Sequence, residues 1–499
     1  MICATVLESS TGAILSRLGE AAPRADLIEV RADAVPPGEL DLRAILERRP
    51  RPIVFTCRPP REGGLFTGSE EDRLRLLREA HDRGAEWVDL EWDVDLALDP
   101  RRVIVSRHDF EGKLEPEALL ASLRARKAAV QKVALAVSDA RAGLALLERA
   151  ARETRPTIAI GMGFPGVATR LLAERAGAPW TYAAAGAPAA PGQLGLEKTS
   201  QLLSGRRVTQ ATKALGILGK PVAHSRSPVL MNAVFGTLRV DAVYAWLETE
   251  EPAALLEEVR GDLGWLGFSV TIPHKETVAR ACDRLSPAAR AIGAVNTVMR
   301  SAGAEPRART PDESGAEHVA KAEWVGHNTD APAVTTVLSR ATKLEGTRVD
   351  LLGAGGAARA AAWALREAGA RVTLHDRTEG RGQALARELG VAFGGPLDRV
   401  RASGEPRIIV NATSVGMGDG RESPVGPGAF DQGTLALDMV YTPEKTRFLE
   451  LAKERGARTV GGIDMFVSQA RAQLEIWLGR HVAQRVSDEW LLARVRHAS

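Results

Sequence analysis

Short apolar runs alternate with amphipathic stretches along the first part of the chain. The runs are typical of strands and cover residues 2–7, 26–31, 52–57, 87–92, 102–108, 130–137, 157–161 and 181–185. Between them lie helical patterns such as 71–83, in which Leu74, Leu77 and His81 recur before Gly84. About eight strand–helix units in succession predict an α/β fold, a closed (β/α)8 TIM barrel, over residues 1–205.

A second α/β pattern begins at Lys213 and contains one glycine-rich turn. The strand-like residues 349–352 run into Gly353-Ala354-Gly355-Gly356-Ala357, an Ala-rich helical stretch follows, and another strand-like run covers 371–375. Residues 206–212 are short and polar, which indicates a linker. Residues 301–322 are rich in Ala, Glu, Pro and Arg without an apolar period, which predicts an exposed insertion.

The composition limits the class of protein. A chain of 499 residues is too long for one ordinary domain, and 44% hydrophobic residues supply ample core material. The net charge of +3 comes without a lysine or arginine run, so nothing indicates nucleic acid. Three cysteines have no metal-ligand spacing, and no run of about 18 apolar residues indicates a membrane span. With no leader before the first strand, we expect a cytoplasmic protein without a metal.

Lys132 stands in the strand-like run 130–137, where a parallel barrel favours apolar residues. Because strand side chains alternate between faces, Lys132 shares its face with Ala134 and Ala136. A lysine that points into a crowded interior costs several kcal/mol as a bare cation. Imine formation with a carbonyl compound would explain its presence. The alternative is a lysine at a strand end that extends its amine to solvent.

Further polar residues follow the ends of the expected strands, where barrel enzymes carry their sites. They are Glu29, Arg31, Arg58, Glu62, His108, Arg170 and Gln193. Arginines indicate a carboxylate ligand, the lysine a ketone, and the histidine proton transfer near neutral pH. Alternatively, Glu29 and Arg31 form a structural ion pair, and His108 bonds a backbone carbonyl.

These residues resemble the motif set of type I 3-dehydroquinate dehydratases over nearly all of residues 1–200. The matching segments are 28–33, 56–58, 62–64, 106–110, Lys132, 169–170 and 190–193. The resemblance implies that Lys132 forms an imine with the C3 ketone of 3-dehydroquinate. It also implies that His108 moves the C2 proton and later protonates the departing hydroxyl, while Glu62 orients His108. Glu29, Arg31, Arg58, Arg170 and Gln193 would hold the substrate, and Ala189 departs from a serine that the family often has.

The glycine-rich turn is typical of a dinucleotide site, because glycines let the backbone approach a pyrophosphate at a helix N-terminus. Its context fits, with a strand before it, a helix after it and a second strand about 20 residues on. The candidate cofactor-binding residues of the turn are Gly353, Ala354, Gly355, Gly356 and Ala357. After the second strand, Asp376 favours NAD, whereas Arg377 and Arg381 favour the 2′-phosphate of NADP, and we expect NADP(H).

A second set of polar residues precedes this turn. It comprises Ser225, Ser227, Thr271, Lys275, Asn296 and Asp330. The hydroxyl and amide groups can bond a hydroxylated carboxylate, while Lys275 and Asp330 supply a donor and an acceptor for proton movement during hydride transfer. Alternatively, Ser225 and Ser227 cap a helix before Pro228, and Lys275 is a solvated loop lysine.

Together these motifs resemble shikimate dehydrogenases across residues 213–490, with further matches at 411–417, 438–443 and 462–465. By that resemblance Lys275 and Asp330 are the catalytic pair. The implied substrate-binding residues are Ser225, Ser227, Thr271, Asn296, Asp330, Tyr441 and Gln469. The implied cofactor-binding residues beyond the turn are Arg377, Thr378, Arg381, Thr413, Ser414, Met439, Gly462 and Met465. Met231, Ser269 and Asp376 depart from a histidine and two asparagines that are usual in the family.

The resemblance implies a two-lobed second half. A substrate-binding domain would cover 213–331 with C-terminal helices at 463–499, and a Rossmann NADP-binding domain would cover 332–462. The two halves would dehydrate 3-dehydroquinate to 3-dehydroshikimate and reduce that product to shikimate, with self-association left open. One alternative is a second half that acts on quinate or uses NAD. The other is a non-catalytic regulator, which should have lost Lys132, His108, Lys275 or Asp330.

Overall fold

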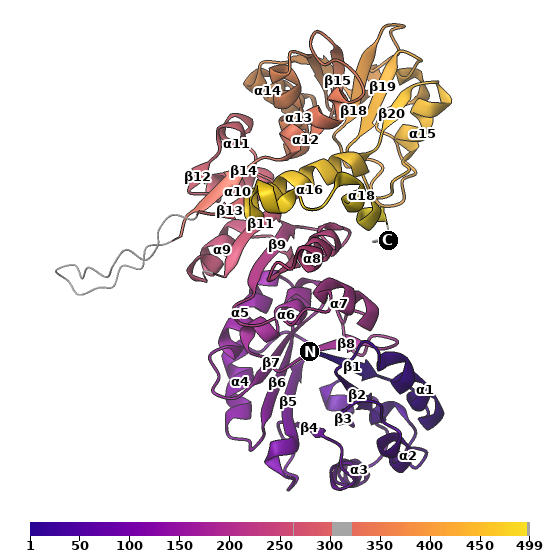
Figure 1. The fold of residues 1–499 in the computed structure, drawn as a ribbon, viewed down its shortest axis with the longest axis vertical. Coiled ribbons are helices and arrows are strands. Elements are labelled where there is room, and N and C mark those ends of the chain that lie inside the picture. Colours follow the sequence, from indigo (N-terminus) through magenta and orange to yellow (C-terminus); the bar gives the residue numbers. More distant parts are fainter. Residues whose placement is uncertain (263, 302–321, 497–499) are drawn as a thin grey trace, which may run out of the picture. The chain divides into compact units, whose positions relative to one another are not determined.

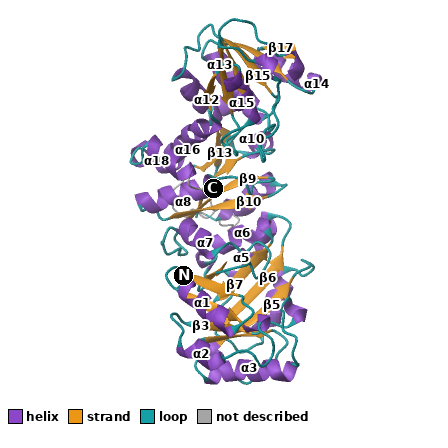
Figure 2. Cartoon of the chain, turned by 90° about the vertical axis from the view of Figure 1, so that its right-hand side faces the viewer, coloured by secondary structure: helices purple, strands orange, loops and turns teal. Residues whose placement is uncertain are grey.

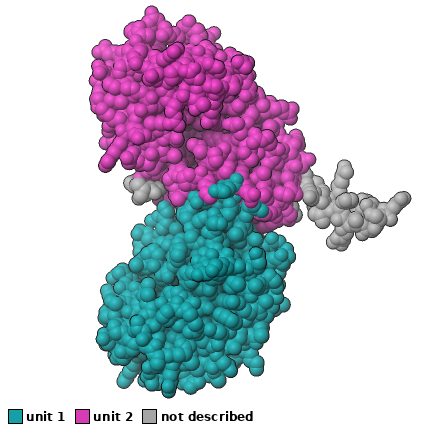
Figure 3. Space-filling view, turned by 180° about the vertical axis from the view of Figure 1, so that it is seen from behind, with its two compact units in different colours: residues 1–216, 231–250 teal, residues 217–230, 251–499 magenta. Residues whose placement is uncertain are grey.

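The computed structural model describes residues 1–262, 264–301 and 322–496. The chain forms two compact units, residues 1–216 with 231–250 and residues 217–230 with 251–499 (Figure 3). The expected insertion at 301–322 lies outside the described residues except at its two ends. Three sheets organise the chain, and each of them falls within one of the domains expected from the sequence.

The first sheet contains eight parallel strands in the order β7-β6-β5-β4-β3-β2-β1-β8 (Figure 1). The strands are β1 (Ile2–Val6), β2 (Leu27–Arg31), β3 (Ile53–Thr56), β4 (Trp87–Glu91), β5 (Val103–Asp109), β6 (Val130–Ala136), β7 (Thr157–Met162) and β8 (Thr181–Ala184). Every one of these bounds lies within one residue of the run expected from the sequence. The barrel prediction is confirmed in its strands.

Helices surround these strands (Figure 2). They are α1 (Thr11–Ala21), α2 (Leu42–Glu47), α3 (Glu70–Asp82), α4 (Pro116–Arg124), α5 (Ala140–Ala150), α6 (Val167–Leu171) and α7 (Leu196–Leu203). Local capping explains where several begin, because the side chains of Ser10, Asp41, Ser69 and Asp139 accept hydrogen bonds from the first turns of α1, α2, α3 and α5. Glu70, Glu71 and Asp72 add negative charge to the first turn of α3.

Two details of the barrel differ from a closed ring of eight strand–helix units. Between β4 and β5 the chain makes only a 3-10 turn, Pro100–Arg102, because the connection is too short for a helix that packs on both strands. Between β7 and β8 the described residues form no ladder. Instead Ala184 bonds the segment that follows β8, through Leu194 O at 2.9 Å, and Gly163 after β7 donates to Pro191 O at 3.1 Å. The barrel is therefore nearly closed.

The inner face of the barrel changes from apolar to polar along the strands. Cys3, Leu27, Val54, Ile104 and Val130 belong to one buried apolar cluster. Two residues further along the same strands, on the same face, stand Thr5, Glu29, Thr56, Ser106 and Lys132. These five apolar residues lie where the strands begin, so the polar groups gather towards the end where the strands finish.

The second sheet is mixed and has the order β10-β9-β11-β13-β14-β12. Its strands are β9 (Lys213–Gly219), β10 (Ala242–Glu248), β11 (Trp265–Val270), β12 (Arg284–Leu285), β13 (Thr297–Arg300) and β14 (Trp324–His327). The helices of this part are α8 (Ser227–Leu238), α9 (Pro252–Glu258), α10 (Lys275–Ala281) and α11 (Pro287–Ile292). The expected linker 206–212 is packed in place, because Val208 is buried and Arg206 donates to Val240 O and Ala242 O.

The third sheet is parallel and has the order β17-β16-β15-β18-β19-β20. This is the strand order of a dinucleotide-binding doubly wound fold. Its strands are β15 (Arg348–Leu352), β16 (Arg371–His375), β17 (Ala392–Gly395), β18 (Arg407–Asn411), β19 (Thr434–Asp438) and β20 (Arg458–Val460). The helices of this part are α12 (Asp330–Ser339), α13 (Gly356–Glu367), α14 (Glu379–Leu389) and α15 (Arg447–Glu454). The C-terminal helices α16 (Gly462–Leu478), α17 (Arg480–Ala483) and α18 (Asp488–Arg496) follow β20, and α16 bonds the second sheet through Gln473 and Trp477.

Strand residues alternate between two cores on the faces of this sheet. Leu351 and Val410 join the core that contains residues of α12, α13 and α14, whereas Leu352 and Ile409 join the core that contains residues of α15. Burial on both faces explains the uninterrupted apolar centres of β18 and β19, residues 408–410 and 435–437. Among the described residues, the longest apolar helical stretches fall short of what crossing a membrane requires.

Candidate active sites

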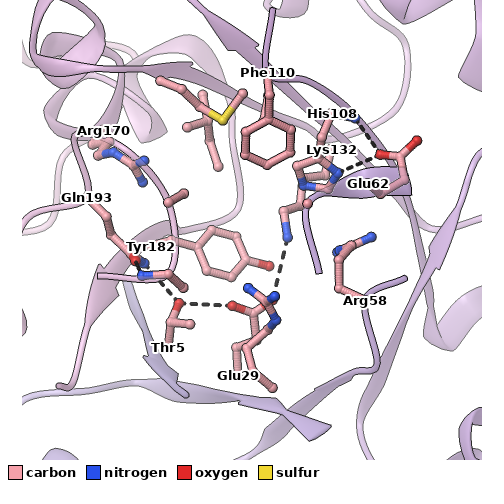
Figure 4. A pocket seen from close by; sticks show the side chains of 17 residues that line it. Thr5, Glu29, Arg58, Glu62, His108, Phe110, Lys132, Arg170, Tyr182 and Gln193 are labelled. Atoms are coloured by element: carbon pink, nitrogen blue, oxygen red, sulfur yellow. Dashed lines mark hydrogen bonds and ion pairs between the residues drawn. The ribbon is translucent and has the colours of Figure 1, made fainter. Parts of the chain in front are cut away.

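A pocket of about 510 Å³, its open mouth included, lies where the barrel strands end (Figure 4). It brings together every barrel residue singled out from the sequence: Glu29, Arg31, Arg58, Glu62, His108, Lys132, Arg170 and Gln193. The rest of its wall comes from Thr5, Gly63, Phe110, Ala134, Ile160, Met162, Tyr182, Ala189 and Ala190.

The Lys132 side chain points into this pocket rather than to solvent, and the residue is only 5% exposed. Its Nζ donates to Asp89 Oδ2 at 2.9 Å and lies 3.5 Å from Glu29 Oε1. The ring of Tyr182 lies 4.5 Å from Nζ and contributes a cation–π contact. The solvated-lysine alternative is therefore wrong, and the amine faces the space that a carbonyl compound would occupy.

Three charged residues behind the pocket were missed by the sequence analysis. Asp89 and Glu91 on β4 are fully buried, and so is Arg73 on α3. Arg58 Nη2 lies 2.9 Å from Asp89 Oδ1, and Arg58 Nη1 donates to Glu91 Oε1 at 2.8 Å. Arg73 donates to Glu91 Oε2 at 2.7 Å. The spacing of Asp89 and Glu91, which places both acids on one face of a strand, could have indicated this site. The sequence did not indicate which residues they would pair with.

Asp89 is held ionised by its surroundings. Burial on its own would raise the pKa of this carboxyl, but the positive charges of Arg58 and Lys132 and a hydrogen bond from Ser106 bring the pKa below its ordinary value. Arg58 is correspondingly engaged with three acceptors, Asp89, Glu91 and Ser106. It is therefore part of the wall as much as a donor to a ligand.

Glu62 and His108 form a hydrogen-bonded pair at the pocket edge. Glu62 Oε2 lies 2.9 Å from His108 Nδ1 and accepts from the His108 backbone N–H at 2.8 Å, while Trp92 donates to Glu62 Oε1 at 3.1 Å. Burial raises the pKa of Glu62 to about 7. Burial, with the charges of Arg58 and Lys132, lowers the pKa of His108 well below its ordinary value. The expected alternative, a histidine bonded to a backbone carbonyl, is not what His108 does.

Two of the three arginines expected to bind a carboxylate, Arg31 and Arg170, behave differently from each other. Arg31 forms a bidentate pair with Asp33, with two contacts of 2.8 Å, so the alternative of a structural Glu29–Arg31 ion pair is wrong. Glu29 instead accepts from Thr5 and Thr56, each at 2.9 Å. Arg170 is buried, and its Nε and Nη2 have no hydrogen-bond partner among the described residues. Burial lowers its pKa to about 10, so it stays cationic at neutral pH.

An unpartnered buried guanidinium fits an anionic ligand. Figure 4 shows Arg170 on the side of the pocket away from Glu62, with Gln193 below it. Gln193 accepts from the backbone N–H of Ala189 at 2.7 Å and donates to Thr5 at 3.0 Å. The position that departs from a serine thus still anchors Gln193, through its backbone. The pocket can hold a carboxylate at one end and offer an amine and a proton carrier at the other.

A second pocket, of about 1120 Å³ with its open mouth, lies in the second unit. Of the residues singled out from the sequence, it is lined by Ser227, Thr271, Lys275, Asp330, Ala357, Thr413, Ser414, Met439, Tyr441, Gly462, Met465 and Gln469. Its wall further includes His224, Ser269, Ile272, Met417 and Phe466, none of which was assigned a role. The rest of the glycine-rich turn, Ser225, Asn296, Arg377, Thr378 and Arg381 lie outside this lining.

Lys275 and Asp330 meet in this second pocket. Lys275 Nζ donates to Asp330 Oδ2 at 2.5 Å, which is not the solvated loop lysine of the alternative interpretation. Asn296 is fully buried and donates to Asp330 Oδ1 at 2.8 Å and to Thr329 at 2.9 Å. Asn296 therefore fixes the Asp330 carboxylate in this structure. Its expected contact with a substrate stays a prediction.

Ser225 and Ser227 lie together at the start of α8, both buried, with 3.3 Å between their hydroxyl oxygens. Tyr441 stacks on Phe466 at 4.5 Å between ring centroids. Burial raises the pKa of Tyr441, and a hydrogen bond with Ser225 opposes the rise. The departure at Ser269 is accommodated by Gln473 of α16, which accepts its hydroxyl at 3.0 Å. These hydroxyls suit a ligand that carries several of its own.

The glycine-rich turn fits a dinucleotide pyrophosphate. Gly353 has φ of +106°, and a Cβ there would come within 3.0 Å of Thr413. A Cβ on Gly356, the first residue of α13, would come within 3.1 Å of Lys275. Only glycine leaves this approach to the N-terminus of α13 open, and the free backbone N–H groups of that turn attract phosphate.

The turn after β16 carries both Asp376, which favours NAD, and the two arginines, which favour NADP. Asp376 Oδ1 accepts the backbone N–H of Thr378 at 2.8 Å, so the carboxylate is tied to its own loop. Arg377 and Arg381 are exposed. Arg381 Nη2 lies 3.8 Å from the point where a Cβ on Gly355 would stand, which places this guanidinium beside the turn. Among the described residues, no group of three His, Cys, Asp or Glu side chains is arranged to hold a metal ion.

Comparison with known proteins identifies relatives of both halves. The family model of type I 3-dehydroquinase matches residues 2–210, and that of the shikimate dehydrogenase substrate binding domain matches residues 217–298. The chain is 33% identical over 518 residues, 96% of this chain and 82% of the relative, to a chloroplastic bifunctional 3-dehydroquinate dehydratase/shikimate dehydrogenase of Arabidopsis thaliana.

Two further relatives cover the second half. The shikimate dehydrogenase (NADP(+)) of Syntrophobacter fumaroxidans is 41% identical over 276 residues, 55% of this chain and 90% of the relative. A crystal structure of shikimate 5-dehydrogenase from Thermus thermophilus, in complex with NADP(H) and shikimate, has 34% identity and a TM-score of 0.48 and covers 57% of this chain and 100% of that one.

Proposed function

We propose two consecutive reactions for this chain, which belongs to the family of bifunctional 3-dehydroquinate dehydratase/shikimate dehydrogenases. The barrel dehydrates 3-dehydroquinate to 3-dehydroshikimate, and the second unit reduces that ketone to shikimate with NADPH. The observation that carries the proposal is the presence, in one chain, of a buried amine beside a Glu62–His108 pair and of a Lys275–Asp330 pair beside a glycine-rich turn.

In the barrel, Lys132 attacks the C3 ketone and forms an imine, which acts as an electron sink for the neighbouring C2–H bond. Neutral His108 takes the C2 proton and returns it to the departing hydroxyl. Ionised Glu62 holds the ring through Nδ1 so that Nε2 is the basic atom. Arg170 neutralises the substrate carboxylate, while Gln193 and Glu29 bond its hydroxyls.

In the second site, the residues present fit NADP(H), which supplies a hydride to the carbonyl carbon when bound. The amides at the start of α13 hold the pyrophosphate, and Arg377, Thr378 and Arg381 take the 2′-phosphate. Lys275 provides the proton that the carbonyl oxygen gains, and Asp330 orients the amine. Ser225, Ser227, Thr271, Tyr441 and Gln469 hold the carboxylate and hydroxyls of the substrate. Met439, Gly462, Met465, Thr413 and Ser414 exclude water beside the reacting carbon.

The test is to give the full chain 3-dehydroquinate and NADPH and to identify the product by mass spectrometry. Shikimate is expected. Quinate would show that the second unit reduces dehydroquinate directly, and dehydroshikimate alone would show that it is not an NADPH-dependent reductase. A protein that bound these compounds without turning them over would be the non-catalytic regulator, an interpretation that the retained Lys132, His108, Lys275 and Asp330 argue against.

Two variants separate the halves. Lys132→Ala should abolish dehydration and leave dehydroshikimate reduction intact, and Lys275→Ala should do the reverse. Lys343→Ala, an exposed lysine paired with Glu345, is the matched control and should retain both activities. Dehydration that persists in Lys132→Ala would refute the imine.

We propose a cytosolic location as well, whereas the Arabidopsis relative is described as chloroplastic. The support is that all three cysteines are free, two of them buried. A fluorescent fusion tests the location in cells, and sedimentation tests whether the chain self-associates.

A further inference from the structure

Among the described residues, Asp89 is the one closely bonded acceptor of the Lys132 amine, and no role has been assigned to it. The competing anion, Glu29, lies 3.5 Å from Nζ, and its two oxygens already accept from Thr5 and Thr56. Tyr182 presents only a ring face at 4.5 Å. The 2.9 Å contact to Asp89 Oδ2 is thus the hydrogen bond that fixes the direction of the amine.

Asp89 cannot follow the amine if the amine moves. Its other oxygen, Oδ1, accepts from Ser106 at 2.5 Å and lies 2.9 Å from Arg58 Nη2. The residue is fully buried on β4, and Ser106 of β5 and Lys132 of β6 are register partners on neighbouring strands. The carboxylate is therefore a fixed point of the barrel wall, held on one side and bonded to the nucleophile on the other.

The fixed position of the Asp89 carboxylate affects the geometry of the proposed Lys132 imine. An ammonium and a ketone give a protonated imine and one water: the C–N bond forms, and the carbonyl oxygen leaves with two of the three protons on nitrogen. One N–H remains. The C=N unit is planar, so the acceptor of that last N–H sets the rotation of the plane about the bond from Cε to Nζ. That rotation decides which C2 hydrogen faces His108.

We propose that Asp89 is a positioning residue of the dehydratase: it accepts the remaining imine N–H and so selects which of the two C2 hydrogens His108 removes. This inference rests on the proposed function, because it needs the Lys132 imine. It assigns Asp89 no contact with the substrate and no proton transfer of its own.

The test is Asp89→Asn in the full chain, which keeps the shape and removes the charge-assisted bond. Borohydride in the presence of 3-dehydroquinate should still reduce an adduct onto Lys132, as mass spectrometry of the peptide detects. The dehydration kcat should fall on the order of tenfold to a hundredfold, with KM within about threefold. Substrates deuterated at one or the other C2 position should show reduced discrimination between the two hydrogens.

Glu91→Gln is the matched variant. It stands two residues along the same strand, is equally buried, and contacts Arg58 and Arg73 of the same ion network but not Lys132. It should keep full discrimination between the C2 hydrogens even if its kcat changes. Equal loss of discrimination in both variants would show a general effect of the network and overturn the proposal.

Ser106→Ala is a second variant that tests the proposal even if the Asp89→Asn chain does not fold. It leaves the carboxylate and removes one of the bonds that hold it, so partial loss of discrimination is expected. The unfolding transition of the barrel itself, measured by calorimetry, reports that each variant is folded, because the second unit has separate cores.

Failure of the proposed imine and failure of the positioning role of Asp89 give different results. If the unaltered chain gives no borohydride adduct, the proposed imine fails. If it gives the adduct and Asp89→Asn keeps wild-type kcat and discrimination, or loses the adduct altogether, the imine stands and the positioning role of Asp89 is refuted.

Discussion

Glu62 and His108 share one hydrogen bond, and the protonation of one sets the tautomer of the other. When Glu62 is ionised, His108 Nδ1 carries the ring proton and donates it, which leaves Nε2 free to accept a proton. When Glu62 is protonated, it donates to Nδ1, and the ring proton moves to Nε2. Because burial lowers the pKa of His108 and raises that of Glu62 to about 7, the switch between these forms lies near neutral pH.

The dehydration kcat/KM should therefore rise with pH through about 7, as Glu62 loses its proton and His108 becomes basic at Nε2. In Glu62→Gln this acidic limb should disappear and the plateau rate should fall roughly a hundredfold. A pH–rate profile between about pH 5 and 9 measures both effects. Glu79→Gln, an exposed acid paired with Arg83, is the control. An unchanged acidic limb in Glu62→Gln would assign the titration to another group.

The buried guanidinium of Arg170 lowers the stability of the ligand-free chain. Its burial without partners is unfavourable, so Arg170→Met should raise the free energy of unfolding of the ligand-free chain by about 1–3 kcal/mol. The same change should raise the dehydration KM roughly tenfold to a hundredfold. Arg31→Met should instead destabilise, because it strands the buried Asp33. Denaturant titration and initial rates test the pair, and destabilisation by Arg170→Met would mean that its charge is balanced in the free protein.

At the scale of elements, the glycine-rich turn joins β15 to α13, and at Gly353 it leaves little room for a side chain. Gly353→Ala would add a Cβ at φ of +106°, within 3.0 Å of Thr413, and should cost about 1–2 kcal/mol of strain. Equilibrium binding of NADP+ should weaken while dehydration is unaffected. Gly380→Ala, where a Cβ meets nothing within 4 Å, is the matched control and should bind NADP+ normally. Normal binding by Gly353→Ala would place the pyrophosphate elsewhere.

The elements that could be predicted from the sequence are those with a strong local pattern. The barrel strands follow from short apolar runs, and Lys132 stands out because it interrupts one of them. The missing helix after β4 was not predicted, although the expected runs 87–92 and 102–108 leave only residues 93–101 between them. Asp89 and Glu91 had a readable spacing, but their partners come from the loop after β3 (Arg58), from α3 (Arg73) and from β6 (Lys132). Ion pairs between residues far apart in the chain produce no local sequence pattern from which they could be predicted.

At the scale of the whole molecule, separate cores fill the barrel and the dinucleotide-binding sheet. We expect calorimetry to resolve two unfolding transitions, of which NADP+ raises only one. At a concentration of about 100 Kd the ligand adds about 2.7 kcal/mol, or roughly 5 °C or more in Tm. Gly353→Ala should lose this shift. A single transition that NADP+ moves as a whole would show that the units unfold together.

In the part of the chain that the structure describes, backbone ladders join all neighbouring strands of the barrel wall except β7 and β8. Met162 stands on one side of that interruption and Tyr182 on the other, and both line the pocket. The ring can therefore widen there without breaking a ladder, and a ligand that contacts Arg170 and Gln193 bridges the two sides. Amide exchange in 157–162 and 181–184 should slow on ligand binding more than in 53–56. A bound substrate would then add contacts across this interruption, where the backbone has only the Gly163–Pro191 and Ala184–Leu194 bonds in place of a ladder.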